Sequence, residues 1–69
     1  MPIVVRLDVA LAQRKMTSRE LAAQIGISEQ NLSMLRSGKA RGVRFNTLEA
    51  ICKALHCQPG DLLEYVHDG

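Results

Sequence analysis

The sequence has no long apolar run. Although 46% of its 69 residues are hydrophobic, no stretch approaches the roughly 20 consecutive apolar residues of a membrane-spanning helix. The layout of a signal peptide is also missing. We therefore expect a cytoplasmic protein with no membrane partner. Its length fits a single domain over residues 1–69 and leaves no room for a small-molecule effector domain.

Cysteine is scarce, with only Cys52 and Cys57 in the chain. If both lie on or just past one helix, residues five apart point in different directions, so we expect no disulfide. The C-x3-H-C spacing that they form with His56 also differs from the paired ligands of a structural zinc site. We therefore predict no metal and no cofactor, and the sequence leaves open whether Cys57 has a redox role.

Recognisable catalytic motifs are also missing. The chain has no glycine-rich phosphate loop after a strand, no nucleophile elbow, and no carboxylate pair with a pocket-sized fold around it. Its two histidines, His56 and His67, are better explained as surface residues than as catalysts. These features favour a binding protein over an enzyme.

The stretch from Ser18 to Ser37 carries the strongest positive signal. Thr17 and Glu20 form a T-x-x-E capping box, which predicts that a helix begins directly after Thr17. Ala22 is small enough for a second helix to pass closely. Gly26 then follows the last periodic residue, where a left-handed backbone conformation is nearly free for glycine. Two short helices joined by a tight turn form a helix-turn-helix.

The second of these helices is predicted over residues 29–37. Ser28 is a good N-cap, Leu32 and Leu35 form a buried stripe, and Gly38 can end the helix. At 100° per residue, the stripe leaves an outward face made of Glu29, Gln30, Ser33, Met34, Arg36 and Ser37. Glutamine can pair with adenine, glutamate can accept from cytosine, serine can donate or accept, and methionine can touch a thymine methyl. The face therefore suits the reading of base edges in DNA.

These residues resemble the lambda-repressor-like helix-turn-helix family, also called XRE. The resemblance rests on the spacing of Ala22 and Gly26 and on the apolar positions Leu21, Ile25, Ile27, Leu32 and Leu35. Residues 47–65 look like the tail of its small stand-alone YozG-type regulators. The resemblance implies an all-α, compact five-helix bundle whose third helix enters the major groove of double-stranded DNA. By the family's pattern, the DNA-facing positions are Ser18, Ser28, Glu29, Gln30, Ser33, Met34 and Ser37. This chain departs from the pattern at two positions, since members often have glutamine in place of Ser18 and Glu29.

Charge is divided unevenly along the chain. Residues 1–44 hold eight Lys or Arg against three Asp or Glu, a net charge of +5, whereas residues 45–69 hold one against four, a net charge of −3. Four cations with no acid among them follow the second helix of the motif: Arg36, Lys39, Arg41 and Arg44. We predict that they bind DNA phosphates together with Ser18 and Arg19, the alternative being a solvated loop with incidental charge.

The rest of the chain predicts a short strand and three further helices. Residues 3–5 suit a strand, which would pair with the C-terminal Leu63, Tyr65 or Val66 of the same or a second subunit, or would simply cover the core. A helix is predicted over residues 7–15, closed by Arg14 and Lys15. Another short helix begins at Pro59.

A fourth helix is predicted over residues 47–56. Asn46 and Glu49 match a capping box, and Phe45 stands where a hydrophobic staple would. The buried stripe of this helix would contain Leu48, Ile51, Cys52 and Leu55.

The leading hypothesis is a sequence-specific DNA-binding transcriptional regulator. A homodimer would place two reading helices about 34 Å apart, and would support a core that supplies only about 3–5 kcal/mol. The termini and the exposed parts of the last helix are candidate dimer surfaces. One alternative is an antitoxin-type autoregulator, although the chain offers little surface for a toxin. Another is a protein–protein interaction module without DNA binding, which Glu29 and the modest net charge of +2 would favour.

Overall fold

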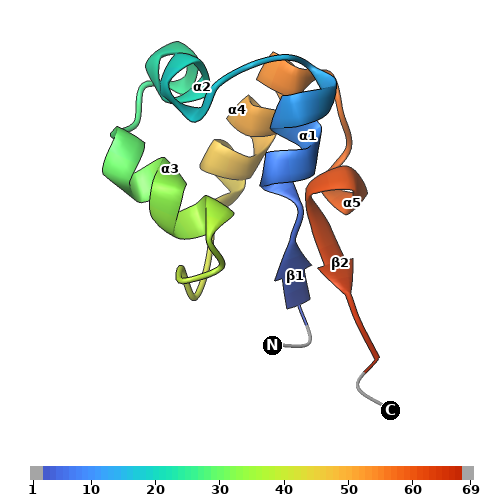
Figure 1. The fold of residues 1–69 in the computed structure, drawn as a ribbon. Helices are drawn as coiled ribbons and strands as arrows, with labels where there is room; N and C mark the ends of the chain where they lie inside the picture. The colour runs from blue at the N-terminus through green and yellow to red at the C-terminus, as the bar shows by residue number, and fades with distance from the viewer. Residues whose placement is uncertain (1–2, 68–69) are drawn as a thin grey trace.

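The computed structural model describes residues 3–67 and arranges five short helices and a two-stranded sheet around one apolar core (Figure 1). The elements are β1 (Ile3–Val5), α1 (Leu7–Gln13), α2 (Ser18–Ile25), α3 (Glu29–Arg36), α4 (Phe45–Leu55), α5 (Pro59–Leu62) and β2 (Leu63–Tyr65). In Figure 1, α4 lies between the α2–α3 pair and the α1–α5 pair. The predicted five-helix fold with a short N-terminal strand is confirmed. No helix in residues 3–67 is long and apolar enough to cross a membrane.

The core draws on every helix. Its fully buried side chains are Leu7, Ala10, Leu11, Leu21, Ala22, Leu32, Ile51, Leu55 and Leu62. None of the polar or charged residues in the described range is fully buried. Helices of 4 to 11 residues are too short to be stable alone in water. Their stability therefore comes from packing their apolar faces against one another.

The start of α2 is fixed by the predicted capping box. The backbone N–H of Glu20 donates to the hydroxyl oxygen of Thr17 at 3.1 Å, and the N–H of Thr17 donates to the Glu20 carboxylate at 3.3 Å. These two bonds satisfy backbone donors that the first turn of a helix leaves without intrahelical partners. The boundary predicted from the sequence is therefore confirmed.

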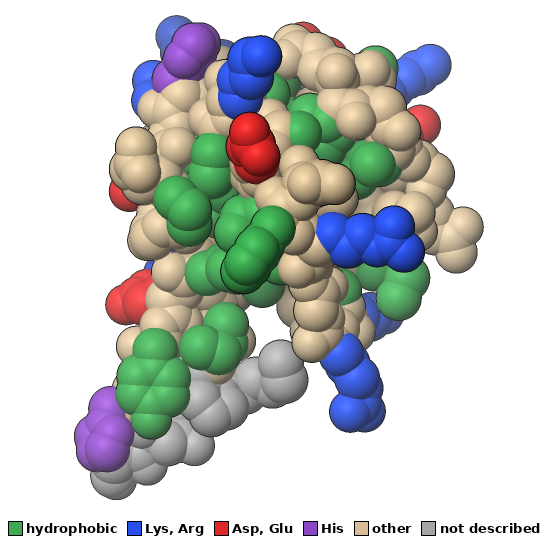
Figure 2. Space-filling view, turned by 180° about the vertical axis from the view of Figure 1, so that it is seen from behind, with side chains coloured by type: hydrophobic (Ala, Val, Ile, Leu, Met, Phe, Trp, Pro, Cys, Tyr) green, Lys and Arg blue, Asp and Glu red, His purple; other side chains and the backbone are tan. Residues whose placement is uncertain are grey.

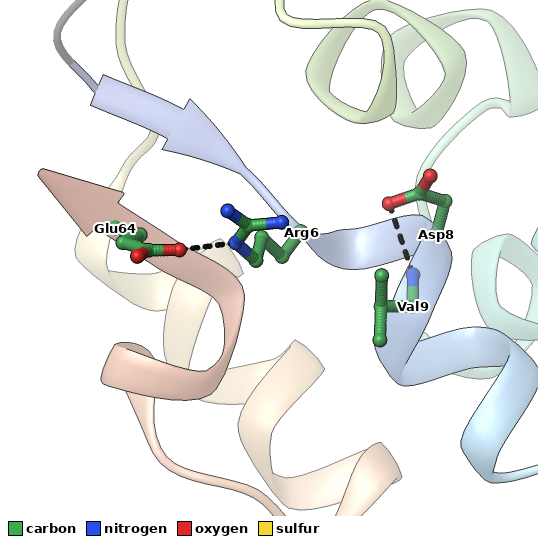
Figure 3. A network of polar contacts seen from close by, with 4 residues as sticks. All are labelled: Arg6, Asp8, Val9 and Glu64. Atoms are coloured by element: carbon green, nitrogen blue, oxygen red, sulfur yellow. Dashed lines mark hydrogen bonds and ion pairs between the residues drawn. The ribbon is translucent and has the colours of Figure 1, made fainter. Parts of the chain in front are cut away.

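The two strands pair with each other within one chain. They run antiparallel, with Ile3 opposite Tyr65 and Val5 opposite Leu63. Just after β1, the guanidinium of Arg6 forms an ion pair with Glu64 of β2 (Figure 3). The backbone N–H of Arg6 donates to the Leu62 carbonyl at 2.6 Å. The predicted strand is confirmed, and of the three alternatives that the sequence left open the structure shows pairing within the chain.

The end of α1 differs from the prediction. The helix stops at Gln13 instead of Lys15, and Lys15 adopts a left-handed conformation with φ of 53°. Arg14 is the C-cap of α1, and its backbone N–H donates to the Ala10 carbonyl at 3.1 Å. Its guanidinium, however, donates to carbonyls outside α1, those of Leu55 at 2.7 Å and His56 at 3.0 Å. These carbonyls belong to the C-terminal end of α4, where a cation is favourable. Arg14 therefore links α1 to α4.

The start of α4 also differs from the prediction. The helix begins at Phe45, two residues early, because Arg44 is extended and its carbonyl accepts the N–H of Leu48 at 2.9 Å. Asn46 is therefore inside the helix, and the predicted capping box with Glu49 is wrong. Phe45 is not buried as a staple either, since its side chain is 85% exposed.

The two cysteines lie together at the C-terminal end of α4. His56 caps the helix in a left-handed conformation, which lets the N–H of Cys57 donate to the Cys52 carbonyl at 3.0 Å. Both free thiols are half-buried and line the same hollow, so the expectation that they point in different directions is wrong. Burial, and next the neighbouring Cys52, raise the pKa of the Cys57 thiol.

We predict that Ala22→Leu lowers the free energy of unfolding by ~1–3 kcal/mol, because the larger side chain overpacks a site where Ala22 is only 2% exposed. Urea unfolding measures this loss. The matched control is Ala23→Leu, one residue along the same helix and exposed, which should change stability by less than about 0.5 kcal/mol. Equal effects of the two substitutions would contradict the packing described above.

The raised pKa of Cys57 predicts slow alkylation at neutral pH. In the folded protein, the rate of modification by iodoacetamide should reach half its maximum above pH 9.0, the ordinary pKa of the thiol. Site-resolved mass spectrometry separates Cys57 from Cys52, and the urea-unfolded chain is the control. Because the folded state disfavours the thiolate, this group should also reduce stability as the pH rises through its folded-state pKa. A folded-state midpoint at or below that of the unfolded chain would contradict the burial of this thiol.

Candidate nucleic-acid interface

The turn between α2 and α3 fixes the angle at which the two helices meet. Gly26 ends α2 in the left-handed conformation, with φ of 77° and ψ of 31°, and its N–H donates to the Ala22 carbonyl at 2.9 Å. A Cβ atom at Gly26 would meet nothing within 4 Å, so glycine is favoured there by its backbone conformation and not by lack of space. Ser28 then caps α3 by accepting the N–H of Asn31 at 3.1 Å. Both predicted turn signals are confirmed.

Helix α3 is buried along one narrow line only. Leu32 is completely enclosed and Leu35 is half-buried, whereas the other side chains of the helix are exposed. Among the predicted base-contacting residues, the structure brings Glu29, Gln30, Ser33 and Met34 onto this exposed surface. The helix therefore presents a short, mostly uncharged face to solvent, as direct readout of bases requires.

The other two predicted base-contacting residues, Ser28 and Ser37, stand at the ends of α3. The hydroxyl oxygen of Ser28 already accepts a backbone N–H as the N-cap. Ser37 lies just past the last helical residue, and its hydroxyl donates to the Met34 carbonyl at 3.2 Å. Each hydroxyl keeps only part of its hydrogen-bonding capacity for a base. These two serines are thus less available than the residues between them.

Asn31 is an exposed residue of the same helix that the sequence reasoning did not select. It lines a shallow groove together with Met34 of α3 and Arg44 of the following loop. Residues four apart share a helix face, so the sequence pattern placed Asn31 next to Leu35 and close to the apolar stripe of the helix. Because Leu35 is only half-buried, the buried stripe of α3 is narrower beside Leu35 than the sequence predicted. Asparagine has the same amide group that pairs with adenine in the major groove.

A basic loop joins α3 to α4 beside the exposed face. The backbone N–H groups of Lys39 and Ala40 both donate to the Met34 carbonyl, at 3.0 and 3.1 Å, so the start of the loop is tied to the last turn of α3. The cationic residues predicted to bind phosphates are all exposed: Arg36, Lys39, Arg41 and Arg44. Within residues 3–67, the single ion pair joins Arg6 to Glu64. The cations of the loop are therefore available for an anionic partner.

The two predicted phosphate contacts at the start of α2 differ in accessibility. Arg19 is exposed in the first turn. The hydroxyl oxygen of Ser18, in contrast, is enclosed and has no hydrogen-bond partner among the described residues. In this arrangement the Ser18 hydroxyl does not reach the surface, so any contact with a phosphate would have to come from its backbone.

Other kinds of site find little support in the described structure. Across residues 3–67, no three His, Cys, Asp or Glu side chains lie close enough together to hold a metal ion. His56 is exposed at the end of α4 and His67 is exposed beyond β2. The exposed α3 face and its basic loop are therefore the main candidate site.

Over nearly its whole length, the chain is similar to proteins that are named as transcriptional regulators or as a candidate DNA-binding protein. It is 57% identical over 68 residues to the HTH-type transcriptional regulator YozG of Bacillus subtilis strain 168, covering 99% of this chain and 81% of that protein. A crystal structure of a candidate DNA-binding protein from Bacteroides fragilis matches with a TM-score of 0.79 and 31% identity, covering 90% of this chain and 98% of the other. The transcriptional regulator VanUg matches with a TM-score of 0.76 and 29% identity, covering 97% and 88%.

The family model for Cro/C1-type helix-turn-helix DNA-binding domains matches residues 6–68. That range contains both helices of the motif, the basic loop and the three other helices, α1, α4 and α5. The helix-turn-helix inferred from the sequence and the geometry of α2 and α3 agree with this match. The chain belongs to the Cro/C1-type helix-turn-helix DNA-binding domain family.

Proposed function

We propose that this protein is a sequence-specific regulator of transcription that acts in the cytoplasm by occupying promoter DNA. One observation carries the proposal: the exposed face of α3 lies beside four accessible cations that have no acidic partner in the described structure. A face that offers hydrogen bonds supplies sequence preference, and flanking cations supply affinity for the phosphate backbone. The names of the similar regulators support the same function.

In this proposal, α3 enters the major groove of double-stranded DNA with its N-terminal half leading. Gln30 pairs with an adenine, Met34 contacts a thymine methyl, and Ser33 donates to or accepts from a base edge. Glu29 accepts from the amino group of a cytosine, and this contact compensates for placing a carboxylate near phosphates. Ser28 and Ser37 make secondary contacts, because their hydroxyls also cap the helix.

The cations act on the phosphate backbone and not on the bases. Arg36, Lys39, Arg41 and Arg44 reach phosphates from the C-terminal side of α3, and Arg19 reaches one from the start of α2, with the backbone of Ser18 beside it. Neutralising phosphates releases condensed counterions, so binding weakens as the salt concentration rises. A homodimer places the two α3 helices in successive major grooves about 34 Å apart.

Two alanine substitutions separate base reading from phosphate binding. Gln30→Ala should relax the preference at one base position and weaken specific binding by ~1–3 kcal/mol, because it removes an amide that contacts a base edge. Gln24→Ala is the matched control, since Gln24 is an exposed glutamine near the end of α2 and should leave DNA binding unchanged. Titration of duplexes with single-base replacements measures both. Equal losses on every duplex would exclude Gln30 as a reader.

Arg44→Ala should weaken binding to all duplexes alike. Because one phosphate contact is lost, the slope of log K against log salt concentration should fall in magnitude by about one unit. The measurement is fluorescence anisotropy at several salt concentrations, with Arg14→Ala as the control, since Arg14 is directed to the end of α4. An unchanged salt slope for Arg44→Ala, or a change in base preference, would contradict the assigned role.

A further inference from the structure

The end of α4 brings two cysteine thiols to one place. His56 ends the helix in a left-handed conformation, with φ of 51°. The backbone N–H of Cys57 then donates to the Cys52 carbonyl at 3.0 Å. Both thiols are free, both are half-buried, and both line the same hollow beside α4. The chain therefore reverses direction at His56 and folds Cys57 back toward Cys52.

This way of ending a helix pairs two side chains. After a left-handed cap, the next residue bonds to a carbonyl of the last helical turn, and the side chains of these two residues commonly touch. The end of α2 has the same pattern, since the N–H groups of Gly26 and Ile27 donate to the Ala22 carbonyl at 2.9 and 3.1 Å. There the paired side chains are hydrocarbon, because Ala22 is buried in the core and Ile27 packs against the core.

At the end of α4, cysteine occupies both of the paired positions. Cys52 and Cys57 also pack against the core, but hydrocarbon side chains fill this role at the end of α2, so packing does not require two thiols. Burial is the main cause that raises the pKa of the Cys57 thiol, and the neighbouring Cys52 is the next. The two thiols are therefore close enough to interact. Two cysteines held near each other can be joined by a disulfide, which spans Cα atoms about 4.4–6.8 Å apart.

The thiol pair lies where a small molecule can reach it. The hollow opens to solvent, and its rim includes the exposed residues His56, Gln58 and Pro59. Figure 2 shows hydrophobic side chains, the class in which cysteine is coloured, gathered in the middle of one face of the molecule. Every residue that lines the hollow lies on α4 or between α4 and the start of α5. The hollow is thus separate from the exposed face of α3 that is proposed to read DNA.

We propose that Cys52 and Cys57 form a thiol–disulfide exchange site whose oxidant is a low-molecular-weight disulfide. One protein thiol loses its proton, and its sulfur attacks the small disulfide, forming a mixed disulfide and releasing one small thiolate, which takes up a proton. The second protein thiol then attacks the mixed disulfide in the same way. The Cys52–Cys57 bond forms and a second small thiol leaves. Two protein thiols are thereby oxidised, and one small disulfide is reduced to two thiols.

Equilibration with reduced and oxidised glutathione tests the site. The purified full-length chain is incubated in buffer and in urea, quenched with acid and weighed by mass spectrometry. A bond within one chain lowers its mass by two hydrogens. After digestion with trypsin, which cuts after Lys53, the bond links peptides 45–53 and 54–69. Relative to the unfolded chain, the folded protein should favour this disulfide about tenfold or more, because folding holds the second thiol beside the first.

The stability of the oxidised protein gives a second reading of the same ratio. If folding favours the disulfide tenfold, the disulfide must favour folding tenfold, which equals about 1.4 kcal/mol in the free energy of unfolding. The oxidised protein should therefore unfold at a higher urea concentration than the reduced protein. Cys57→Ser is the control, since it should form only a mixed disulfide with glutathione and lose no hydrogens.

Two substitutions at His56 test the role of the left-handed cap. His56→Gly places a residue there that adopts this conformation readily, so the preference of the folded protein for the disulfide should remain. His56→Val places a β-branched residue where the conformation is strongly disfavoured, so the preference should fall by about fivefold or more. Circular dichroism checks that both variants are folded. Equal preferences in the two variants would overturn the role of the cap.

Three results would overturn the site itself. The first is a folded protein that favours the disulfide no more than the unfolded chain does. The second is an oxidised protein that is no more stable than the reduced one, and the third is oxidation that joins two chains instead of closing a bond within one. Because DNA takes no part in these measurements, each of these results would leave the proposed regulator standing.

Discussion

The packing of α2 against α3 and α4 buries Ala22 and Leu32 in one core, and a side chain as small as that of Ala22 suits a close crossing of helices. Gly26 makes this crossing possible by adopting a left-handed conformation at the end of α2, and Ser28 starts α3 only two residues later. The crossing directs the apolar line of α3 inward, and its remaining side chains are exposed as a result. The face proposed to read DNA therefore depends on packing at a position that never touches DNA.

Backbone hydrogen bonds join the exposed face of α3 to the basic loop. The Met34 carbonyl accepts two backbone N–H groups from the loop, so Lys39 begins the loop at a fixed place beside α3. Phosphate contacts made by the loop would consequently orient the helix that reads bases. On the other side of the core, the guanidinium of Arg14 binds the last carbonyls of α4 and ties that helix to α1.

The parts of the structure that were predictable from the sequence are those set by local interactions. Three features of this kind are the capping box of Thr17 and Glu20, the turn at Gly26 and the N-cap at Ser28. In each of them the interacting residues lie within four positions of one another, so the local sequence is enough to predict the contact. The start of α4 was predicted wrongly because Asn46 and Glu49 match a capping box equally well, while the helix extends to include Phe45.

Contacts between residues far apart in the chain could not be predicted from the sequence pattern. The role of Arg14 depends on carbonyls 41 and 42 residues away, and the contact between the cysteines depends on the left-handed conformation of His56. In the candidate site, exposed Gln30, Ser33 and Met34 followed from helical periodicity. The exposure of Asn31 did not follow from periodicity, because periodicity could not show that Leu35 is only half-buried. The enclosed hydroxyl of Ser18 could not be seen from the sequence either, since the family's pattern placed that residue on the DNA side.

The most direct test is fluorescence anisotropy of the purified protein on the DNA upstream of its own gene and on a shuffled duplex of equal composition, at several salt concentrations. If α3 reads sequence while the basic loop binds phosphates, the upstream DNA should be bound about 10³-fold more tightly or better, with a steep dependence on salt for both duplexes. Equally weak binding to both duplexes at every salt concentration would contradict the account.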